Sequence, residues 1–255
     1  MKLVTLNTWG GLAGEEKLLS FFEKYKDEVD IFCLQEIWAG AYKELDGKSV
    51  GGRNLEHDKI MMNGLQSISK TLSGHSAYFR PHFMEHYGLL IYIKKNIKIL
   101  DEGEVFVHKH KGYMPEGDVG GHARNIQYIT LDTENGLKTI INFHGLWNGK
   151  GKGDSEDRLT QSDKIVGFIS KLNNHVVFCG DFNLLPETES IKKFEDIGLT
   201  NLIKEHGVTS TRTSLYDKSI RYADYVFVSK DLKVVDFRVL PEEVSDHNAL
   251  LLDFN

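Results

Sequence analysis

Cysteine is scarce in this chain of 255 residues, which contains only Cys33 and Cys179. Each lies inside an apolar run, a setting typical of a buried free thiol, and a single disulfide between them is the alternative. So few cysteines favour a reducing, intracellular compartment, and we expect a cytoplasmic protein. The amino terminus lacks an apolar run long enough for a secretory signal, and no later run approaches the length of a membrane span.

An excess of basic residues is also absent, because 31 Lys and Arg residues stand against 37 Asp and Glu residues, a net charge of −6. This balance argues against sequence-independent binding of nucleic acid through a basic surface. It does not exclude a nucleic-acid substrate that is held mainly through a metal ion. The sequence has no internal repeat, low-complexity tract or linker, so it predicts one domain over residues 1–255, and we expect a monomer.

Many short stretches alternate between apolar and polar residues, as β-strands do, and a few have the period of an amphipathic helix. Asn135-Gly136 predicts a tight reversed turn within a hairpin over 126–144, and Asn63 is the expected cap of a helix over 64–73. Further strands are predicted at 2–9, 30–36, 76–83, 88–95, 104–110, 176–183, 222–229, 233–240 and 249–254, and further helices at 15–28, 156–172 and 188–195. This order predicts an α/β fold in which two mostly antiparallel sheets pack face to face under covering helices.

Two segments, 39–62 and 108–122, connect strands without a clear period and are predicted to be loops that flank a binding site. Five residues of the second segment either form a patch for an anionic substrate or belong to a solvated loop: His108, Lys109, His110, Lys111 and His122. Three aromatic residues, Trp38, Tyr113 and Trp147, either stack on a base or anchor their loops.

Six apolar segments each have a polar group at one end. Taken singly, each group has an ordinary structural explanation, such as a turn, a solvated strand end or a structural histidine; their joint occurrence points to a site. The alternation of a strand also places Asp181 and Asn183 on one face and turns Phe182 into the core. The groups are Asn7, Glu36, His144, the pair Asp181 and Asn183, Asp224, and the pair Asp246 and His247.

This set of side chains suits a hard divalent cation. It has no thiolate ligands, too few closely spaced histidines for zinc and no His-Glu-x-x-His motif, whereas carboxylate and amide oxygens are ligands for Mg²⁺ or Mn²⁺. Such an ion offsets charge on phosphate oxygens, and a histidine oriented by an acid positions or deprotonates water. The set therefore indicates metal-dependent hydrolysis of a phosphoester.

Six blocks occur in a fixed order along the chain: LNTW, LQE, NFHG, GDFN, YADYV and SDH. In this order they resemble the endonuclease/exonuclease/phosphatase superfamily, which includes deoxyribonuclease I, the abasic-site endonucleases, inositol polyphosphate 5-phosphatases and neutral sphingomyelinases. The resemblance runs from Asn7 to His247 and implies a four-layer αββα sandwich, in agreement with the fold predicted from the strand and helix pattern.

The resemblance also implies roles. Glu36 would be the main direct metal ligand, with Asn7 and Asp246 in the metal shell. Asp181 and Asn183 would orient the attacking water and contact the phosphate. His247 would be the general base or stabilise the transition state, Asp224 would hydrogen-bond it, and His144 would bind the phosphate or assist the leaving group. Arg124 is either a phosphate contact or an exposed arginine at a strand start.

The resemblance indicates the type of reaction, but it does not identify the substrate. NFHG occupies the place of the tyrosine-centred motif of abasic endonucleases, which favours the deoxyribonuclease, sphingomyelinase or phosphatase branches. We expect a phosphodiesterase or nuclease, with nucleic acid among the candidate substrates. The alternatives are a phosphomonoesterase acting on a small sugar, inositol or nucleotide phosphate, which the acidic net charge favours, and an inert phosphate-binding relative.

Overall fold

The computed structural model describes residues 1–41, 43–50 and 53–255. Its first six-stranded sheet has the order β13-β14-β1-β2-β6-β5. Within the described residues of this sheet, β1 and β2 pair in parallel and the other neighbours are antiparallel. The strands are β1 (Lys2–Asn7), β2 (Ile31–Trp38), β5 (His75–Phe83), β6 (Tyr87–Lys94), β13 (Val234–Val239) and β14 (Leu250–Phe254).

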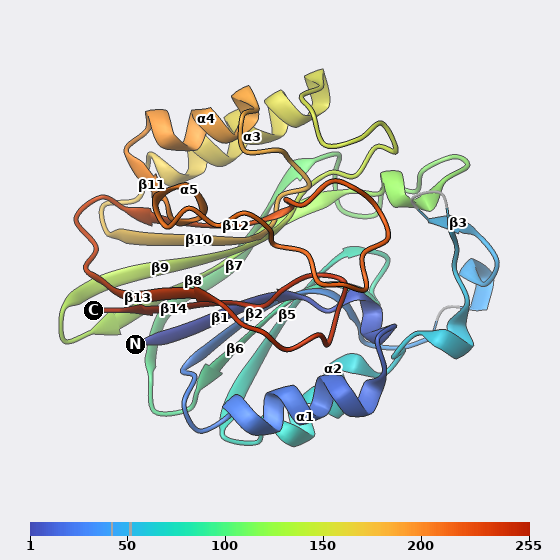
Figure 1. The fold of residues 1–255 in the computed structure, drawn as a ribbon, viewed down its shortest axis with the longest axis horizontal. Coiled ribbons are helices and arrows are strands. Elements are labelled where there is room, and N and C mark those ends of the chain that lie inside the picture. The colour runs from blue at the N-terminus through green and yellow to red at the C-terminus, as the bar shows by residue number, and fades with distance from the viewer. Residues whose placement is uncertain (42, 51–52) are drawn as a thin grey trace.

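The second six-stranded sheet, with the order β11-β12-β10-β9-β8-β7, repeats this pattern. Its parallel pair is β9 and β10, beside antiparallel neighbours. The strands are β7 (Lys98–His108), β8 (Arg124–Thr133), β9 (Gly136–His144), β10 (His175–Asp181), β11 (Leu199–Asn201) and β12 (Asp224–Ser229). The two sheets lie against each other. The carboxyl ends of both parallel pairs, β1 with β2 and β9 with β10, point to the same edge of the sandwich (Figure 1).

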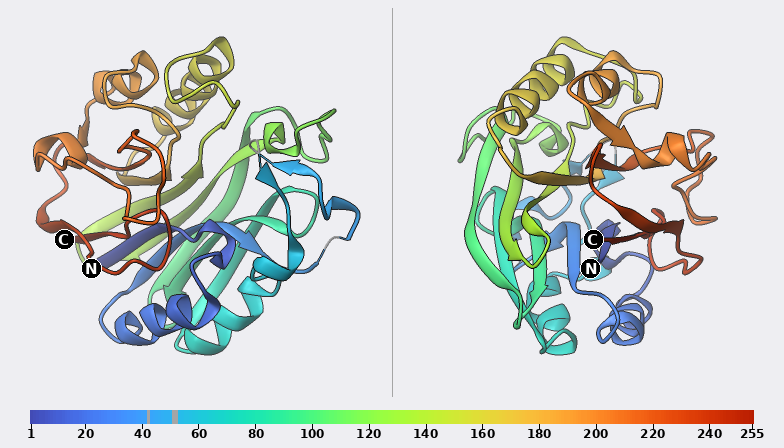
Figure 2. Two further views of the ribbon diagram at one scale, coloured as in Figure 1. Left: turned by 45° about the vertical axis from the view of Figure 1, so that its right-hand side comes forward. Right: turned by 90° about the vertical axis from the view of Figure 1, so that its left-hand side faces the viewer.

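Helices cover the outer faces of both sheets, and Figure 2 shows the four layers from two further sides. One group, α1 (Glu15–Tyr25) and α2 (Gly64–Thr71), lies on the first sheet; the other, α3 (Glu156–Ile169), α4 (Glu189–Asp196) and α5 (Leu202–Glu205), lies on the second. Short 3₁₀ turns are η1 (Trp9–Gly11), η2 (Lys43–Leu45), η3 (His57–Lys59) and η4 (Val119–Gly121), and β3 (Ser49–Val50) pairs with β4 (Arg53–Asn54). The predicted αββα sandwich is confirmed.

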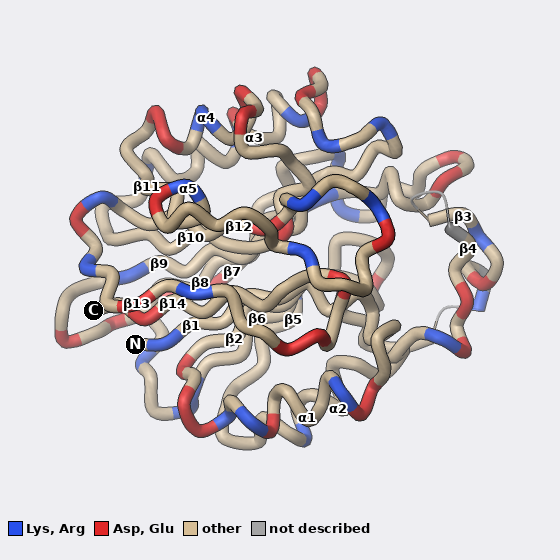
Figure 3. Tube along the Cα trace, in the orientation of Figure 1, with Lys and Arg blue, Asp and Glu red and all other residues tan. Residues whose placement is uncertain are grey.

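The apolar pattern of the sequence explains the layers. Helix α1 buries Leu18, Phe21, Phe22 and Tyr25, which its 3.6-residue period places on one stripe against the first sheet. Burying each such side chain fully contributes about 1.5–3 kcal/mol. Charged residues gather on the helices and connecting loops, while the central strands are nearly free of them (Figure 3). In the part of the chain that is described, no helix is long and apolar enough to cross a membrane.

Strands β2 and β10 are buried on both faces, between the partner sheet and a helix layer, and therefore have continuous apolar runs. Cys33 and Cys179 lie on these strands as buried free thiols, as predicted. A buried hydrogen bond of 2.7 Å from Gln35 Nε2 to Asn142 Oδ1 joins β2 to β9 across the two sheets. This link fixes the register of the sheets near the edge where the polar residues meet.

Several local predictions were right in position but wrong in detail. Asn63 stands at the N-cap of α2 but makes no side-chain capping bond. The predicted hairpin is confirmed, because β8 and β9 pair antiparallel up to a tight turn between Thr133 and Gly136. The turn type differs: its left-handed residue is Gly136, with φ of 93°, and Asn135 is not left-handed, so the turn is not the mirror-image type. Segment 39–62 is not structureless, because it contains β3, β4 and two 3₁₀ turns; residues 42, 51 and 52 of that prediction lie outside the described residues. The short β11 and α5 had no periodic signal.

Candidate active site

A cavity of about 730 Å³ opens at the edge where the two parallel strand pairs end. The sandwich brings seven of the predicted site residues to its wall: Glu36, Arg124, His144, Asp181, Asn183, Asp246 and His247. Asn7 and Asp224 lie directly behind them and contact them. The structure therefore brings together all nine predicted residues, from both sheets.

Glu36 reaches the cavity because β2 is irregular. The pairing register with β6 shifts between Leu34 and Ile37, and Glu36 has a left-handed φ of 59°. Bulges re-aim side chains, and a non-glycine residue keeps such a φ only where its surroundings enforce it. Burial raises the pKa of the Glu36 carboxyl, and the nearby Asp246 carboxylate adds to this, despite the hydrogen bond from Asn7. A cation beside Glu36 would favour the ionised form of this carboxyl.

Asn7 joins the carboxylates of the two sheets. Its Nδ2 donates to Glu36 Oε1 and to Asp181 Oδ2, both at 3.0 Å, while its Oδ1 accepts from the Trp9 amide at 2.9 Å. In this orientation the amide holds Glu36 and Asp181 together across the sandwich.

Asp181 and Asn183 both face the cavity, but strand alternation is not the cause. Strand β10 ends at Asp181, and Asn183 has a left-handed φ of 54°. The Asn183 amide donates to Asp181 Oδ1 at 2.9 Å, so a side chain–backbone turn sets the pair. Phe182, 1% exposed, packs in the core as predicted. Gly145 is required here, because a Cβ on it would lie 2.2 Å from the Phe182 carbonyl oxygen.

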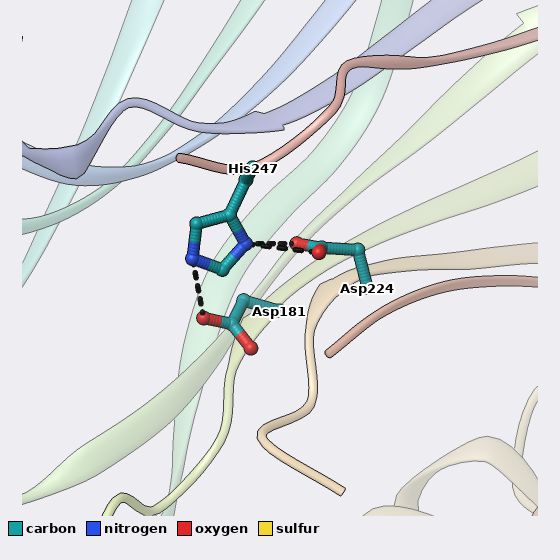
Figure 4. Close-up of side chains that lie close together, drawn as sticks. All are labelled: Asp181, Asp224 and His247. Carbon is teal, nitrogen blue, oxygen red and sulfur yellow. Dashed lines mark hydrogen bonds and ion pairs between the residues drawn. The ribbon is translucent and has the colours of Figure 1, made fainter. Parts of the chain in front are cut away.

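His247 is held between two acids (Figure 4). Its Nδ1 lies 2.8 and 2.9 Å from the two oxygens of Asp224, and its Nε2 lies 3.6 Å from Asp181 Oδ2. Burial lowers the pKa of the imidazole, but the surrounding carboxylates, Asp224 first, outweigh it and the net pKa is raised. The predicted Asp224–His247 bond is present.

Asp181 stays ionised for a related reason. Burial alone would raise the pKa of its carboxyl, but the nearby His247 and Lys152 cations hold it well below its usual range. His144 Nε2 lies 3.8 Å from Asp181 Oδ2 and 3.9 Å from Glu36 Oε1. Burial, with help from Arg124, lowers the pKa of His144 well below its usual value, so this ring is neutral at pH 7.

Arg124 was interpreted either as a phosphate contact or as an exposed arginine at a strand start. The second alternative is wrong, because Arg124 is only 2% exposed. Its guanidinium donates to the Gly120 carbonyl at 3.2 Å and contacts the His122 ring at 2.8 Å. Its Nε has no hydrogen-bond partner among the described residues and its side chain lines the cavity.

The predicted loops do flank the cavity. Of the two alternatives for the histidines and lysines of segment 108–122, the patch for an anionic substrate does not form. Leu45, Leu55 and Ile60 line the cavity from segment 39–62, and Val119 and His122 line it from segment 108–122. The patch does not form because His108 and His122 are buried, at 6% and 3% exposure. Of the three aromatic candidates, Trp38 and Trp147 line the cavity, and Tyr113 is not among its lining residues.

Sequence reasoning missed two cations of the site. Arg212 donates to Asp246 Oδ2 at 2.9 Å and lies over the Tyr216 ring, 4.2 Å from its centroid. Lys152, 3% exposed, lines the same wall. Both come from polar segments between the strands of the second sheet, where lysine and arginine are the normal residues of a solvated loop, so no local signal distinguishes them.

The residues present fit a hard cation. Asp246 Oδ1 is buried and has no hydrogen-bond partner among the described residues, and with Glu36 it supplies carboxylate oxygens to one cavity. A second grouping, Asp181, Asp224 and His247, has ligand atoms within 4.8 Å of one another. There both oxygens of Asp224 already accept from His247, which makes this grouping a hydrogen-bonded relay and leaves the Glu36 side as the candidate place for a metal.

The sequence comparison agrees with this geometry. The model of the Endonuclease/Exonuclease/phosphatase family matches residues 4–247, so the chain belongs to that family, whose members are hydrolases of phosphoesters. No curated protein sequence matches the chain.

Solved structures share the fold at low identity. One is an endonuclease/exonuclease/phosphatase from Bacteroides vulgatus, with 16% identity and a TM-score of 0.70 over 100% of this chain and 98% of that one. A mannosyl-6-phosphatase of Bacteroides thetaiotaomicron has 14% identity and a TM-score of 0.69 over 100% and 99%. The human Nocturnin catalytic domain with bound sulfate has 19% identity and a TM-score of 0.65 over 100% and 94%.

Proposed function

We propose that the protein is a divalent-metal-dependent phosphodiesterase, with Mg²⁺ or Mn²⁺ as its ion and nucleic acid among its candidate substrates. The observation that carries this proposal is the relay of Asp224, His247 and Asp181 beside the carboxylates of Glu36 and Asp246. Glu36 and Asp246 would hold the ion, which when bound would offset charge on the phosphate oxygens.

In this proposal the other side chains of the site have separate roles in proton transfer, in orienting the attacking water and in contacting the phosphate. Asp224 fixes the tautomer of His247, whose Nε2 then faces the cavity and either takes a proton from the attacking water or stabilises developing charge. Asp181 and Asn183 orient that water, and Asn7 holds the acids in place. Neutral His144 and buried Arg124 contact the phosphate or the leaving group.

The test uses purified protein with bis-p-nitrophenyl phosphate and with single- and double-stranded nucleic acid. We expect turnover with Mg²⁺ or Mn²⁺ and none with EDTA. His247→Ala and Asp181→Ala should abolish turnover while circular dichroism shows a folded protein. Absence of metal-dependent cleavage of any phosphodiester would refute the proposal.

A second candidate is hydrolysis of a phosphomonoester of a small sugar, inositol or nucleotide. Three buried cations, Arg124, Lys152 and Arg212, line the cavity and favour a dianionic phosphate. The mannosyl-6-phosphatase among the structures of the same fold makes this class worth testing. Phosphate release from a panel of metabolites separates the two candidates, because cleavage confined to polymers would count against this one.

A further inference from the structure

Lys152 is a buried cation without a hydrogen-bond partner among the residues that the structure describes. Its side chain is 3% exposed and lines the cavity, and its Nζ makes no hydrogen bond to any described residue. A buried ammonium is costly unless it is paired, so its burial needs an explanation beyond packing. Of its charged surroundings, the carboxylates of Asp181, Asp224 and Asp246 favour the ammonium, Asp181 most, while Arg212 opposes it.

The loop that carries Lys152 is held rigidly from its two sides. Arg158, on the first turn of α3 and 2% exposed, donates to the carbonyls of Leu146 at 3.2 Å, Gly151 at 2.8 Å and Gly153 at 2.5 Å. The last two flank Lys152 in the sequence. A fully buried arginine therefore uses its donors to shape this one loop.

The loop is also attached to the segment after β10. The Lys152 carbonyl accepts from the Leu185 amide at 2.9 Å, two residues beyond Asn183. The Asp154 carboxylate accepts from the Glu189 amide at 2.8 Å and from the Ser190 amide at 3.0 Å, at the start of α4. Lys152 is thus fixed relative to Asp181 and Asn183, which is the precision that a substrate contact requires.

The chemistry of the wall identifies the ligand. Arg212 is already paired with Asp246, whereas Lys152 Nζ is buried at the wall of the cavity and none of its three N–H donors is used by a described residue. A phosphate oxyanion would supply the missing charge and hydrogen-bond acceptors. We propose that Lys152 binds a phosphate oxyanion of the substrate and that Arg158 is the residue that positions it. The identity of the ligand as a phosphoester rests on the proposed function.

Binding of inorganic phosphate, measured by isothermal titration calorimetry with EDTA and again with Mg²⁺, tests the contact without requiring turnover. Lys152→Ala and the near-isosteric Lys152→Met should weaken phosphate binding by about tenfold to a hundredfold, the range for a charged hydrogen bond. Lys152→Arg should recover part of the affinity. Lys150→Ala is the matched control, because Lys150 lies exposed in the same loop, and should bind as the wild type does. Equal affinity in folded Lys152→Ala and wild type, or no phosphate binding by the wild type, would overturn the proposal.

The positioning role of Arg158 needs a measurement that a general loss of stability would not change. Arg158→Lys should weaken phosphate binding. Adding Lys152→Ala to it should cause almost no further loss, because both substitutions remove the same contact between Lys152 and the phosphate. Independent, additive losses would show that Arg158 does not act through Lys152.

Kinetics then separate this inference from the proposed function. If Lys152 supports phosphate binding but no ester is cleaved, the proposed phosphodiesterase activity is refuted and the Lys152–phosphate contact stands. If wild type and Lys152→Ala cleave esters equally, only the Lys152–phosphate contact is refuted. Two substrates locate the oxyanion. An equal loss on bis-p-nitrophenyl phosphate and on a 5′-phosphorylated dinucleotide places it on the reacting group, and a loss confined to the dinucleotide places it on an adjacent phosphate.

Discussion

His247 Nδ1 lies 2.8 Å from Asp224 Oδ1, although 23 residues separate the two in the sequence. Both side chains are buried, at 4% and 2% exposure, so the bond is protected from water. A ring nitrogen that donates to a carboxylate fixes the tautomer and leaves the other nitrogen, here Nε2, as the reactive one. The first prediction follows from this bond.

Asp224→Asn should lower kcat by about 10²- to 10⁴-fold, the usual contribution of a positioned acid–base group. The amide can donate to Nδ1 and so stabilise the tautomer that carries its proton on Nε2. The metal concentration for half-maximal rate should not change, because Asp224 contacts His247 and not the proposed metal ligands. Asp231→Asn is the control, since Asp231 makes a similar contact with His175 at 3.1 Å on the exposed surface. A near-wild-type rate for Asp224→Asn would contradict the role of the relay.

Glu36→Gln should raise the Mg²⁺ concentration for half-maximal rate at least about tenfold, because it removes a direct carboxylate ligand. The variant should stay folded, since burial already raises the pKa of this carboxyl and a neutral amide avoids that cost. Metal titration of the rate, with Glu187→Gln as an exposed control, checks this. An unchanged metal requirement would move the metal site away from Glu36.

Of the acids and histidines that line the cavity, the strand pattern identified Glu36, His144, Asp181, Asp246 and His247, because each closes or opens an apolar strand; it did not single out Glu56 or His122. It reached the Asp181–Asn183 pair for a wrong reason, since the turn bond and the left-handed φ of Asn183 decide their direction. It did not reach Lys152, which lies in a glycine- and lysine-rich loop. The bonds from Arg158 that shape this loop depend on the three-dimensional course of the loop backbone, which the periodic pattern of the sequence does not record.

Acid should destabilise the protein through its buried histidines. Burial lowers the pKa of His82 to about 3, with Arg124 adding to the effect, and burial lowers that of His108 to about 4. Their unfolded forms take up protons below about pH 6.5, so the unfolded state binds more protons in this window. The free energy of unfolding should therefore fall as pH decreases from 6.5, by about 1.4 kcal/mol per unit for each such histidine.

Urea denaturation at pH 7, 6 and 5 measures this slope. His82→Gln should make it shallower. The same slope in wild type and His82→Gln would show that His82 is not neutral in the folded protein.

Lys152→Met should be more stable than the wild type at pH 7 although it binds phosphate less well. Burial, with Arg212 adding to it, lowers the pKa of the Lys152 ammonium to about 8, and the attraction of Asp181, Asp224 and Asp246 only partly compensates. At pH 7 the buried charge of Lys152 therefore lowers the free energy of unfolding by up to about 3 kcal/mol, because the same ammonium is fully solvated in the unfolded chain. Between pH 8 and about 10.5 the folded state has lost this proton while the unfolded state keeps it, so wild-type stability rises with pH relative to the variant. Paired urea denaturation of the two proteins at pH 7 and pH 9.5 should show the advantage of Lys152→Met shrinking. An advantage that is absent, or that does not change with pH, would show that Lys152 is compensated within the free protein and has no unpaired charge to offer a phosphate.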